Sequence, residues 1–119
     1  MACSKGTVTH GAGTINIYTC VDTTSTGVNV TLEGEADQSW GFQGYVKVKL
    51  VRASETSEAW LDVTTKNGGY WDNSSKGNKN ITISNVGYKG AIMRAIPEFY
   101  TDSSYRTKLS STGSHMFVR

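Results

Sequence analysis

The sequence predicts an all-β protein, and a two-sheet antiparallel β-sandwich of seven to eight strands suits it best. Apolar and polar residues alternate with a period of two in several short runs, as in strands that bury one face. Turn-forming residues recur about every ten residues, which is typical of sandwiches and barrels. A length of 119 residues suits one domain, which we expect to span residues 1–119. A small β-barrel is the alternative architecture.

The first half of the chain contains four predicted strands. They cover residues 13–21, 28–33, 41–52 and 60–65. The alternation is cleanest in the second strand, where Val28, Val30 and Leu32 occupy one face and polar residues occupy the other. Between these strands and those that follow, residues 66–69 (Lys-Asn-Gly-Gly) predict a tight turn, because Asn-Gly tolerates positive φ. Residues 72–79 then predict a polar loop.

The second half of the chain contains four further candidates. They cover residues 80–84, 89–100, 105–110 and 115–119. Both faces of 89–100 are partly apolar, which predicts a central strand, although a short helix is an alternative for this segment. Pro97 should end its regular pairing or occupy a bulge, because proline has no N–H to donate to a neighbouring strand.

Cys3 and Cys20 predict one disulfide, because a chain with two cysteines permits a single intramolecular pairing. The bridge would close a loop of about 17 residues and stabilise the fold by about 3 kcal/mol in the chain-entropy view. We expect it to clasp the N-terminal segment against the strand at 13–21. A reduced, buried pair is the alternative. Since disulfides persist in oxidising compartments, we expect a secreted, extracellular protein whose signal peptide has been removed.

The charge balance argues against a nucleic-acid partner. Twelve basic and ten acidic residues give a net charge of +2. The densest basic stretch, Lys47, Lys49 and Arg52, is interleaved with apolar residues and predicts a solvated strand face rather than a phosphate-binding stripe. No apolar run approaches the length of about 20 residues that a membrane helix needs, so we predict no transmembrane segment.

Catalytic and metal-binding patterns are missing from the sequence. His10 and His115 are far apart, and no cysteine pair has zinc-ligand spacing. Glu33, Glu35 and Asp37 form an acidic group in a predicted polar connection, where solvated side chains are the rule. Gly-x-Ser-x-Gly, the nucleophile elbow, does not occur. We therefore predict a protein that is not an enzyme and has no cofactor or metal.

Aromatic residues supply the candidate binding site. Tyr70 and Trp71 precede Asp72 and Asn73, and Trp40 begins a second aromatic group with Phe42 and Tyr45. A ring beside Asp and Asn is the chemistry of a sugar site, because the ring covers an apolar sugar face and fixed polar groups bind hydroxyls. The alternative is that the tryptophans fill the core. Adjacent residues on a strand face opposite ways, so at least one of Tyr70 and Trp71 should be near the surface.

These observations favour a secreted, non-enzymatic binding or interaction module whose ligand is a cell-surface glycan or a protein. Two alternatives remain open at this point. One is a small secreted toxin or antimicrobial protein, which the mild basicity and exported composition allow. The other is a structural or virion subunit, which would assemble with copies of itself.

Overall fold

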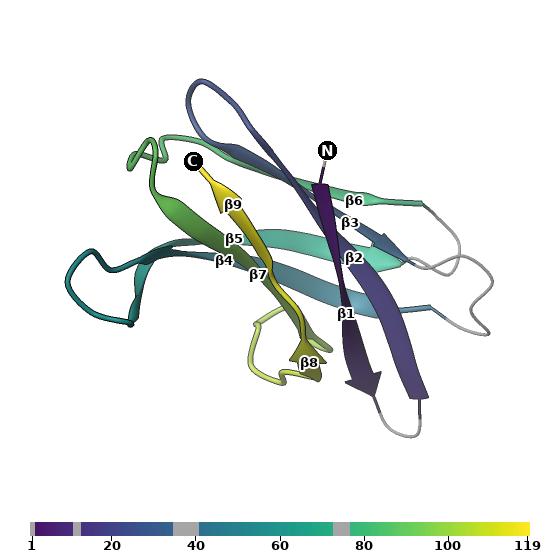
Figure 1. The fold of residues 1–119 in the computed structure, drawn as a ribbon. Coiled ribbons are helices and arrows are strands. Elements are labelled where there is room, and N and C mark those ends of the chain that lie inside the picture. The colour runs from purple at the N-terminus through teal and green to yellow at the C-terminus, as the bar shows by residue number, and fades with distance from the viewer. Residues whose placement is uncertain (1, 11–12, 35–40, 73–76) are drawn as a thin grey trace.

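Two antiparallel β-sheets face each other in the computed structural model, which describes residues 2–10, 13–34, 41–72 and 77–119 (Figure 1). One sheet has the strand order β6-β3-β2-β1-β8, and the other has the order β5-β4-β7-β9. The strands are β1 (Ala2–His10), β2 (Gly13–Thr23), β3 (Val28–Gly34), β4 (Gln43–Ala53), β5 (Trp60–Asp72), β6 (Lys79–Ile83), β7 (Ile92–Tyr100), β8 (Ser110–Thr112) and β9 (His115–Val118). The all-β sandwich predicted from the sequence is confirmed.

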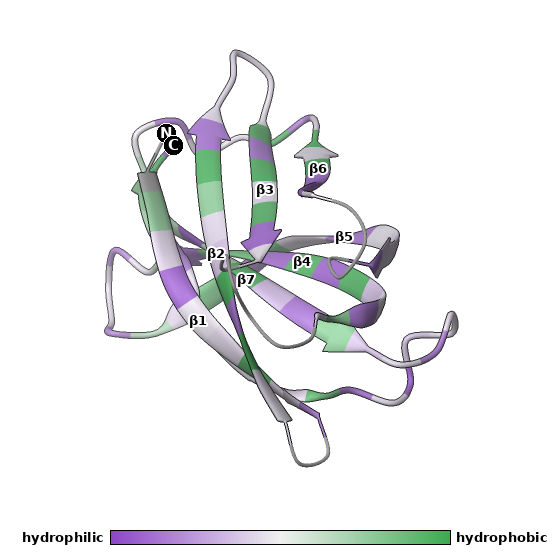
Figure 2. Ribbon diagram, turned by 90° about the vertical axis from the view of Figure 1, so that its right-hand side faces the viewer, coloured by the Kyte–Doolittle hydropathy of each residue, from purple (hydrophilic) through white to green (hydrophobic). Residues whose placement is uncertain are grey.

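The core lies between the two sheets and is made by the alternating apolar positions. Figure 2 shows this alternation as hydrophobic and hydrophilic bands along the strands. In β3 the inward residues Val28, Val30 and Leu32 are fully buried. In β4 the inward set is Val46, Val48 and Leu50, also fully buried. Phe42 and Phe99 extend this cluster, with ring centroids 5.1 Å apart in an edge-to-face arrangement.

The two sheets are connected along both sides of the sandwich. On one side β8 pairs with β1 in the first sheet, and β9 pairs with β7 in the second. Gly113 makes the corner with φ of 127°, a conformation that residues with a side chain rarely adopt. On the other side, the Trp71 indole Nε1 donates a hydrogen bond of 3.1 Å to the carbonyl of Gly77, just before β6.

The disulfide predicted from the sequence is present, and it joins β1 to β2. Cys3 and Cys20 lie directly opposite each other in this hairpin, with their Cα atoms 4.1 Å apart. The bridge is thus a clasp within one sheet, as expected, and does not connect the two sheets. The sequence does not predict strand β1, because Val8 is the only buried apolar residue among its described side chains and pairing with β2 defines the strand.

The predicted turn at residues 66–69 is wrong, because β5 continues through it. The register between β4 and β5 shifts there, pairing Val46 with Gly69 and Lys47 with Asn67, so that Gly68 is the extra residue of a β-bulge. Gly69 has φ of 81°. A Cβ on Gly68 would approach the Ile81 Cδ1 atom to 2.5 Å. These glycines therefore serve a bulge and a close contact between sheets instead of a hairpin turn.

Two other sequence predictions need correction in the C-terminal part. The strand predicted at 105–110 begins only at Ser110, because residues 101–109 form a loop closed by the hydrogen bond from the Leu109 N–H to the Phe99 carbonyl. Pro97 neither ends β7 nor interrupts its register, and it pairs with Val48. The β9 pairing ends at Ala95, so this proline lies where β7 has a strand partner on one side only.

Candidate functional site

Trp71 and Tyr70 point to opposite faces of β5, as their adjacency predicts. Trp71 is 4% exposed and packs against Phe42, with ring centroids 6.1 Å apart. Its indole therefore belongs to the core and presents no ring face to solvent. Tyr70 is 53% exposed on the outer face of the same sheet. The candidate sugar platform is thus Tyr70 rather than Trp71.

Of the remaining predicted site residues, the structure describes Asp72, which follows Tyr70 by two residues and so lies on the same face of β5. Asp72 pairs in register with Gln43 at the end of β5, where it is partly buried. Trp40 and Asn73 lie outside the described residues. A further neighbour of Tyr70 is Tyr45 of the adjacent strand β4.

Four tyrosines form a cluster on the outer face of the β5-β4-β7-β9 sheet. Tyr45 of β4 pairs in register with Tyr70 of β5 on one side and with Tyr100 of β7 on the other. Tyr105 reaches the same face from the loop after β7, with its ring centroid 6.1 Å from Tyr45 and 5.4 Å from Tyr100. The Tyr45 and Tyr70 centroids are 5.5 Å apart, again edge to face. We call Tyr45, Tyr70, Tyr100 and Tyr105 the tyrosine cluster.

Local hydrogen bonds hold Tyr105 in place. The carboxylate of Asp102 accepts hydrogen bonds from the backbone N–H groups of Arg106 and Thr107, and these bonds lower the pKa of that carboxyl. Tyr105 has φ of 55°, a left-handed conformation that the turn imposes. Its hydroxyl accepts a hydrogen bond of 3.1 Å from the N–H of Gly69 in the β5 bulge. The loop after β7 is thereby attached to β5 across the sheet.

A lysine ammonium lies over the rings of the cluster. Lys47 Nζ is 5.2 Å from the ring centroids of both Tyr100 and Tyr105, which is within cation–π range. Next to it, Glu98 forms an ion pair with Lys108 at 2.9 Å, and the hydrogen bond raises the pKa of Lys108. Burial, then the charge of Glu98, raises the pKa of the Tyr100 hydroxyl. The cluster thus has the Lys47 ammonium at its centre and the Glu98 carboxylate at its edge, where Glu98 accepts a hydrogen bond of 3.4 Å from the Tyr100 hydroxyl.

The sequence identified only Tyr70 among these residues. The sequence places Tyr45 in an aromatic group with Phe42, and it does not predict Tyr100 or Tyr105 as binding residues. The signal that unites Tyr45, Tyr70 and Tyr100 is the strand register, which aligns positions 25 and 55 residues apart.

Ser4 and His115 make a polar contact that resembles part of a catalytic arrangement. The Ser4 Oγ and the His115 Nδ1 are 2.8 Å apart and connect β1 with β9. Burial lowers the pKa of His115. Among the described residues no carboxylate hydrogen-bonds to this ring, so the pair lacks the group that would orient a general base. In the described ranges no group of three His, Cys, Asp or Glu side chains could hold a metal ion.

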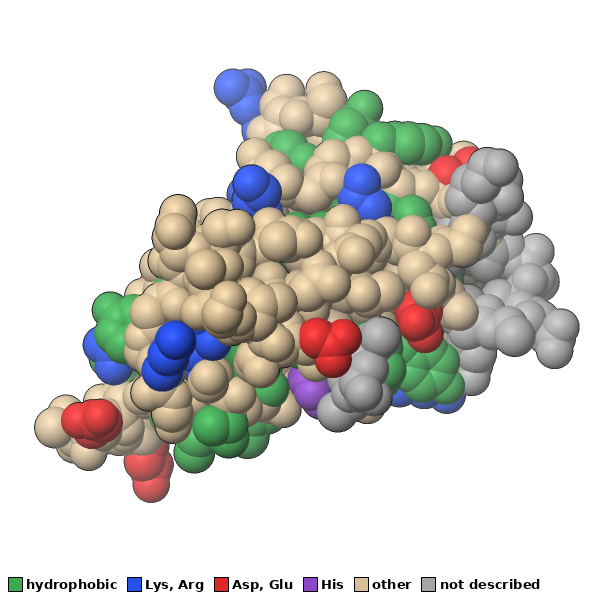
Figure 3. Space-filling model, turned by 90° about the horizontal axis from the view of Figure 1, so that it is seen from above, with side chains coloured by type: hydrophobic (Ala, Val, Ile, Leu, Met, Phe, Trp, Pro, Cys, Tyr) green, Lys and Arg blue, Asp and Glu red, His purple; other side chains and the backbone are tan. Residues whose placement is uncertain are grey.

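The molecule seen from above shows no concentrated charge (Figure 3). Basic and acidic side chains are scattered among uncharged polar ones on that face. Within the described part of the chain, no helix is long and apolar enough to cross a membrane.

Comparison of the chain with protein-family models, with curated proteins and with solved structures found no match. The geometry offers a cluster of four tyrosines in which Tyr70 is exposed, Tyr45 and Tyr105 are partly buried and Tyr100 is buried, with the Lys47 ammonium over two of the rings.

Proposed function

We propose that this protein is a non-enzymatic binding module that recognises a glycan through the tyrosine cluster. The observation that carries the proposal is the exposed ring of Tyr70, aligned with Tyr45 across two strands and continued by Tyr105. A flat ring covers the apolar C–H face of a sugar, and nearby hydroxyls and an ammonium bind its oxygens. Lys47 and the tyrosine hydroxyls supply those polar groups.

The proposed place of action is outside the cytoplasm. The Cys3–Cys20 disulfide supports it, because such bridges persist in oxidising compartments and are rare in reducing ones. Cys3 is exposed, so a reducing environment would reach the bridge directly. A cell-surface glycan would be present in the same compartment.

The test is a screen of the protein on a glycan array, followed by titration of any neutral glycan that binds. Tyr70→Ala should weaken binding by about tenfold, because it removes the exposed ring and its edge-to-face contact. The matched control is Tyr18→Ala, a tyrosine on the outer face of the opposite sheet that pairs with Lys5 and Glu33. This control should leave the affinity unchanged.

Two outcomes would contradict the proposal. One is the absence of any bound glycan on the array. The other is a glycan whose affinity is the same for Tyr70→Ala as for the unmodified protein. The Tyr70 side chain lies outside the core, so its removal should leave the fold intact, and circular dichroism checks this.

A second candidate function, an assembling structural subunit, is favoured by three exposed apolar residues. Ile92, Met116 and Val118 lie on the neighbouring strands β7 and β9, and Ile92 pairs in register with Val118. Exposed apolar residues that cluster in this way are typical of protein contacts. Light scattering behind a sizing column would show assemblies at micromolar concentration, and a monomer would contradict this function. A toxin or antimicrobial role stays a prediction, which growth inhibition or liposome leakage would test.

A further inference from the structure

A cleft opens at the end of the sandwich that is remote from the tyrosine cluster. Its volume is about 460 Å³, which lies within the range of small-molecule sites. It is formed between the end of β4 with its following turn and the turn before β7. The lining residues are Arg52, Ala53, Ser54, Glu55, Tyr88, Lys89, Gly90, Ala91 and Ile92.

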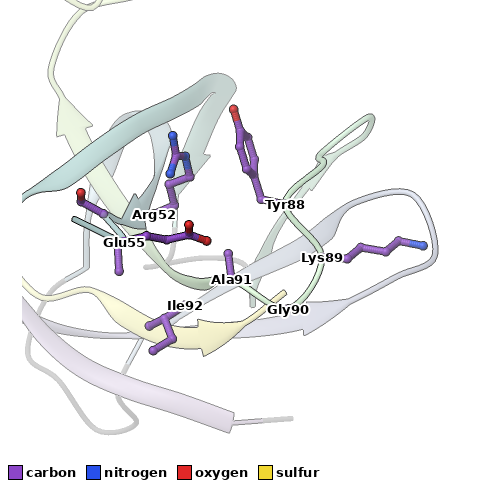
Figure 4. A pocket seen from close by; sticks show the side chains of 9 residues that line it. Arg52, Glu55, Tyr88, Lys89, Gly90, Ala91 and Ile92 are labelled. Atoms are coloured by element: carbon purple, nitrogen blue, oxygen red, sulfur yellow. The ribbon is translucent and has the colours of Figure 1, made fainter. Parts of the chain in front are cut away.

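Arg52 presents a guanidinium to this cleft without a hydrogen-bonding partner among the described residues. The guanidinium makes a cation–π contact with the ring of Tyr88, whose centroid is 4.6 Å from the Arg52 Cζ atom. Figure 4 shows the two side chains standing beside each other. Stacking on a ring orients a guanidinium and leaves its five N–H donors at the edge, where they can bind a carboxylate in a bidentate manner.

Among the described cations, Arg94 resembles Arg52 because its guanidinium also lies over a ring, that of Trp60, but it does not line the cleft. Three other cations have polar partners. The Arg119 guanidinium donates hydrogen bonds to the carbonyls of Thr24 and Val86. Lys49 and Lys108 form ion pairs with Asp62 and Glu98. Arg52 is therefore a donor group held in place but not used within the described structure.

A turn at residues 88–91 places Tyr88 at the cleft. The Ala91 N–H donates a hydrogen bond of 2.9 Å to the Tyr88 carbonyl, and Gly90 inside this turn has φ of 86°. Tyr88 itself has φ of 59°, which is unfavourable for a bulky residue and is maintained by its surroundings. The backbone of the turn thus sets the direction of the Tyr88 Cα–Cβ bond, and the ring lies against the Arg52 guanidinium.

The charges around the cleft select among anionic ligands. Figure 4 shows Glu55 directed into the cleft near Arg52, whereas Lys89 points away from both. The Glu55 carboxylate offsets the attraction of the Arg52 guanidinium for anions, so the pair has little net charge to attract a multiply charged group such as a phosphate. Tyr88, Ala91 and Ile92 supply apolar walls for the body of the ligand.

We propose that this cleft binds a small monocarboxylate whose carboxyl group is received by Arg52 and whose apolar body lies against Tyr88 and Ile92. The site is independent of the tyrosine cluster, because none of its lining residues belongs to that cluster. A ligand of this class could be free or could be the acidic end of a larger molecule.

Titration with benzoate, followed by nuclear magnetic resonance, tests the proposal. We expect saturable shifts of the Arg52 side-chain N–H and of residues 88–92, with a dissociation constant on the order of 1 mM. Benzamide, the neutral counterpart, should bind about tenfold more weakly, because the charge-assisted hydrogen bonds are lost. Inorganic phosphate should also bind more weakly than benzoate.

Four variants make the test specific. Arg52→Gln should weaken benzoate binding by about tenfold, and Arg52→Lys by less, because lysine keeps the charge without the planar fork. Glu55→Gln should strengthen it by about threefold, because a repelling charge is removed. Arg94→Gln is the matched control and should have no effect. Its guanidinium also stacks on a ring, that of Trp60 at 4.6 Å, but it does not line the cleft.

Several results would overturn the proposal. They are the absence of saturable shifts with benzoate, equal binding of benzamide, unchanged binding by Arg52→Gln, or weaker binding by Glu55→Gln. If Arg52→Gln does not fold, the Glu55→Gln result decides, because that residue is exposed on a turn.

Discussion

Burial lowers the pKa of His115, so this single imidazole makes the stability of the fold depend on pH. The lowered pKa belongs to the folded state, and the unfolded chain therefore binds the proton more readily. The contribution of His115 is complete above the ordinary histidine pKa of about 6.5. It is lost progressively as the pH falls from there through the lowered folded-state value.

The free energy of unfolding should consequently decrease as the pH is lowered from about 7 to about 5, by at most about 1.4 kcal/mol per pH unit. His115→Asn removes the titrating group while an amide oxygen or nitrogen can still meet the Ser4 hydroxyl. This variant should show a shallower dependence, measured by urea unfolding at each pH. An equal slope in both proteins would assign the effect to other groups.

Tyr70 and Trp71 show how far a residue-level prediction reaches. Their adjacency alone predicted that they face opposite ways, and the exposure of Tyr70 confirms it. Which of the two is buried depends on the face of β5 that meets the core, and Phe42 and Gly77 decide this for Trp71. An isolated strand pattern with apolar character on both faces contains no such information.

At the scale of elements, β2 is anchored by core residues such as Ile15 and Ile17, whereas β1 contributes few apolar contacts of its own. Among the side chains that the structure describes in β1, Val8 is the one buried apolar residue, and Cys3 pairs with Cys20 near the open end of the hairpin. The clasp therefore holds an N-terminal strand that would otherwise fray.

The double variant Cys3→Ser with Cys20→Ser should unfold at a lower temperature and keep its fold. A bridge that closes a loop of this length contributes about 3 kcal/mol. Calorimetry measures the change in melting temperature, and amide exchange should show that protection is lost first in β1. Complete unfolding of the variant at room temperature would show that the remaining core is weaker than the strand pattern suggests.

The β5 strand illustrates the limit of turn prediction from sequence. Asn67, Gly68 and Gly69 have the residue types of a hairpin turn, yet they form a bulge within a long strand. Whether these residues form a turn or a bulge depends on the adjacent strand β4, because β4 pairs with β5 on both sides of Gly68. Gly68 is then required for close contact with Ile81 of the opposite sheet.

At the scale of the whole molecule, the two sheets share a single cluster of buried apolar side chains, and stability should be lost from both sheets together. Leu50 lies in this cluster and is fully buried, whereas Leu61 of the edge strand β5 is 38% exposed. The same substitution, leucine to alanine, can therefore be compared at Leu50 inside the core and at Leu61 outside it.

Leu50→Ala should reduce the free energy of unfolding by about 2 to 5 kcal/mol, because it removes buried contacts and leaves a cavity. Leu61→Ala should cost less than about 1 kcal/mol. Denaturant unfolding followed by fluorescence and by circular dichroism should give coincident transitions for Leu50→Ala. Separate transitions would indicate that the sheets unfold independently.

Local sequence determined the elements, and tertiary structure determined the surfaces. Alternation predicted the all-β sandwich and most strands, and the cysteine count predicted the bridge, because both depend on nearest neighbours or on simple pairing. Two features were not predictable in the same way. They are the alignment of Tyr45 with Tyr70 and Tyr100 and the contact of Arg52 with Tyr88. They depend on register between strands and on turns far apart in the chain, which the packing of the two sheets sets.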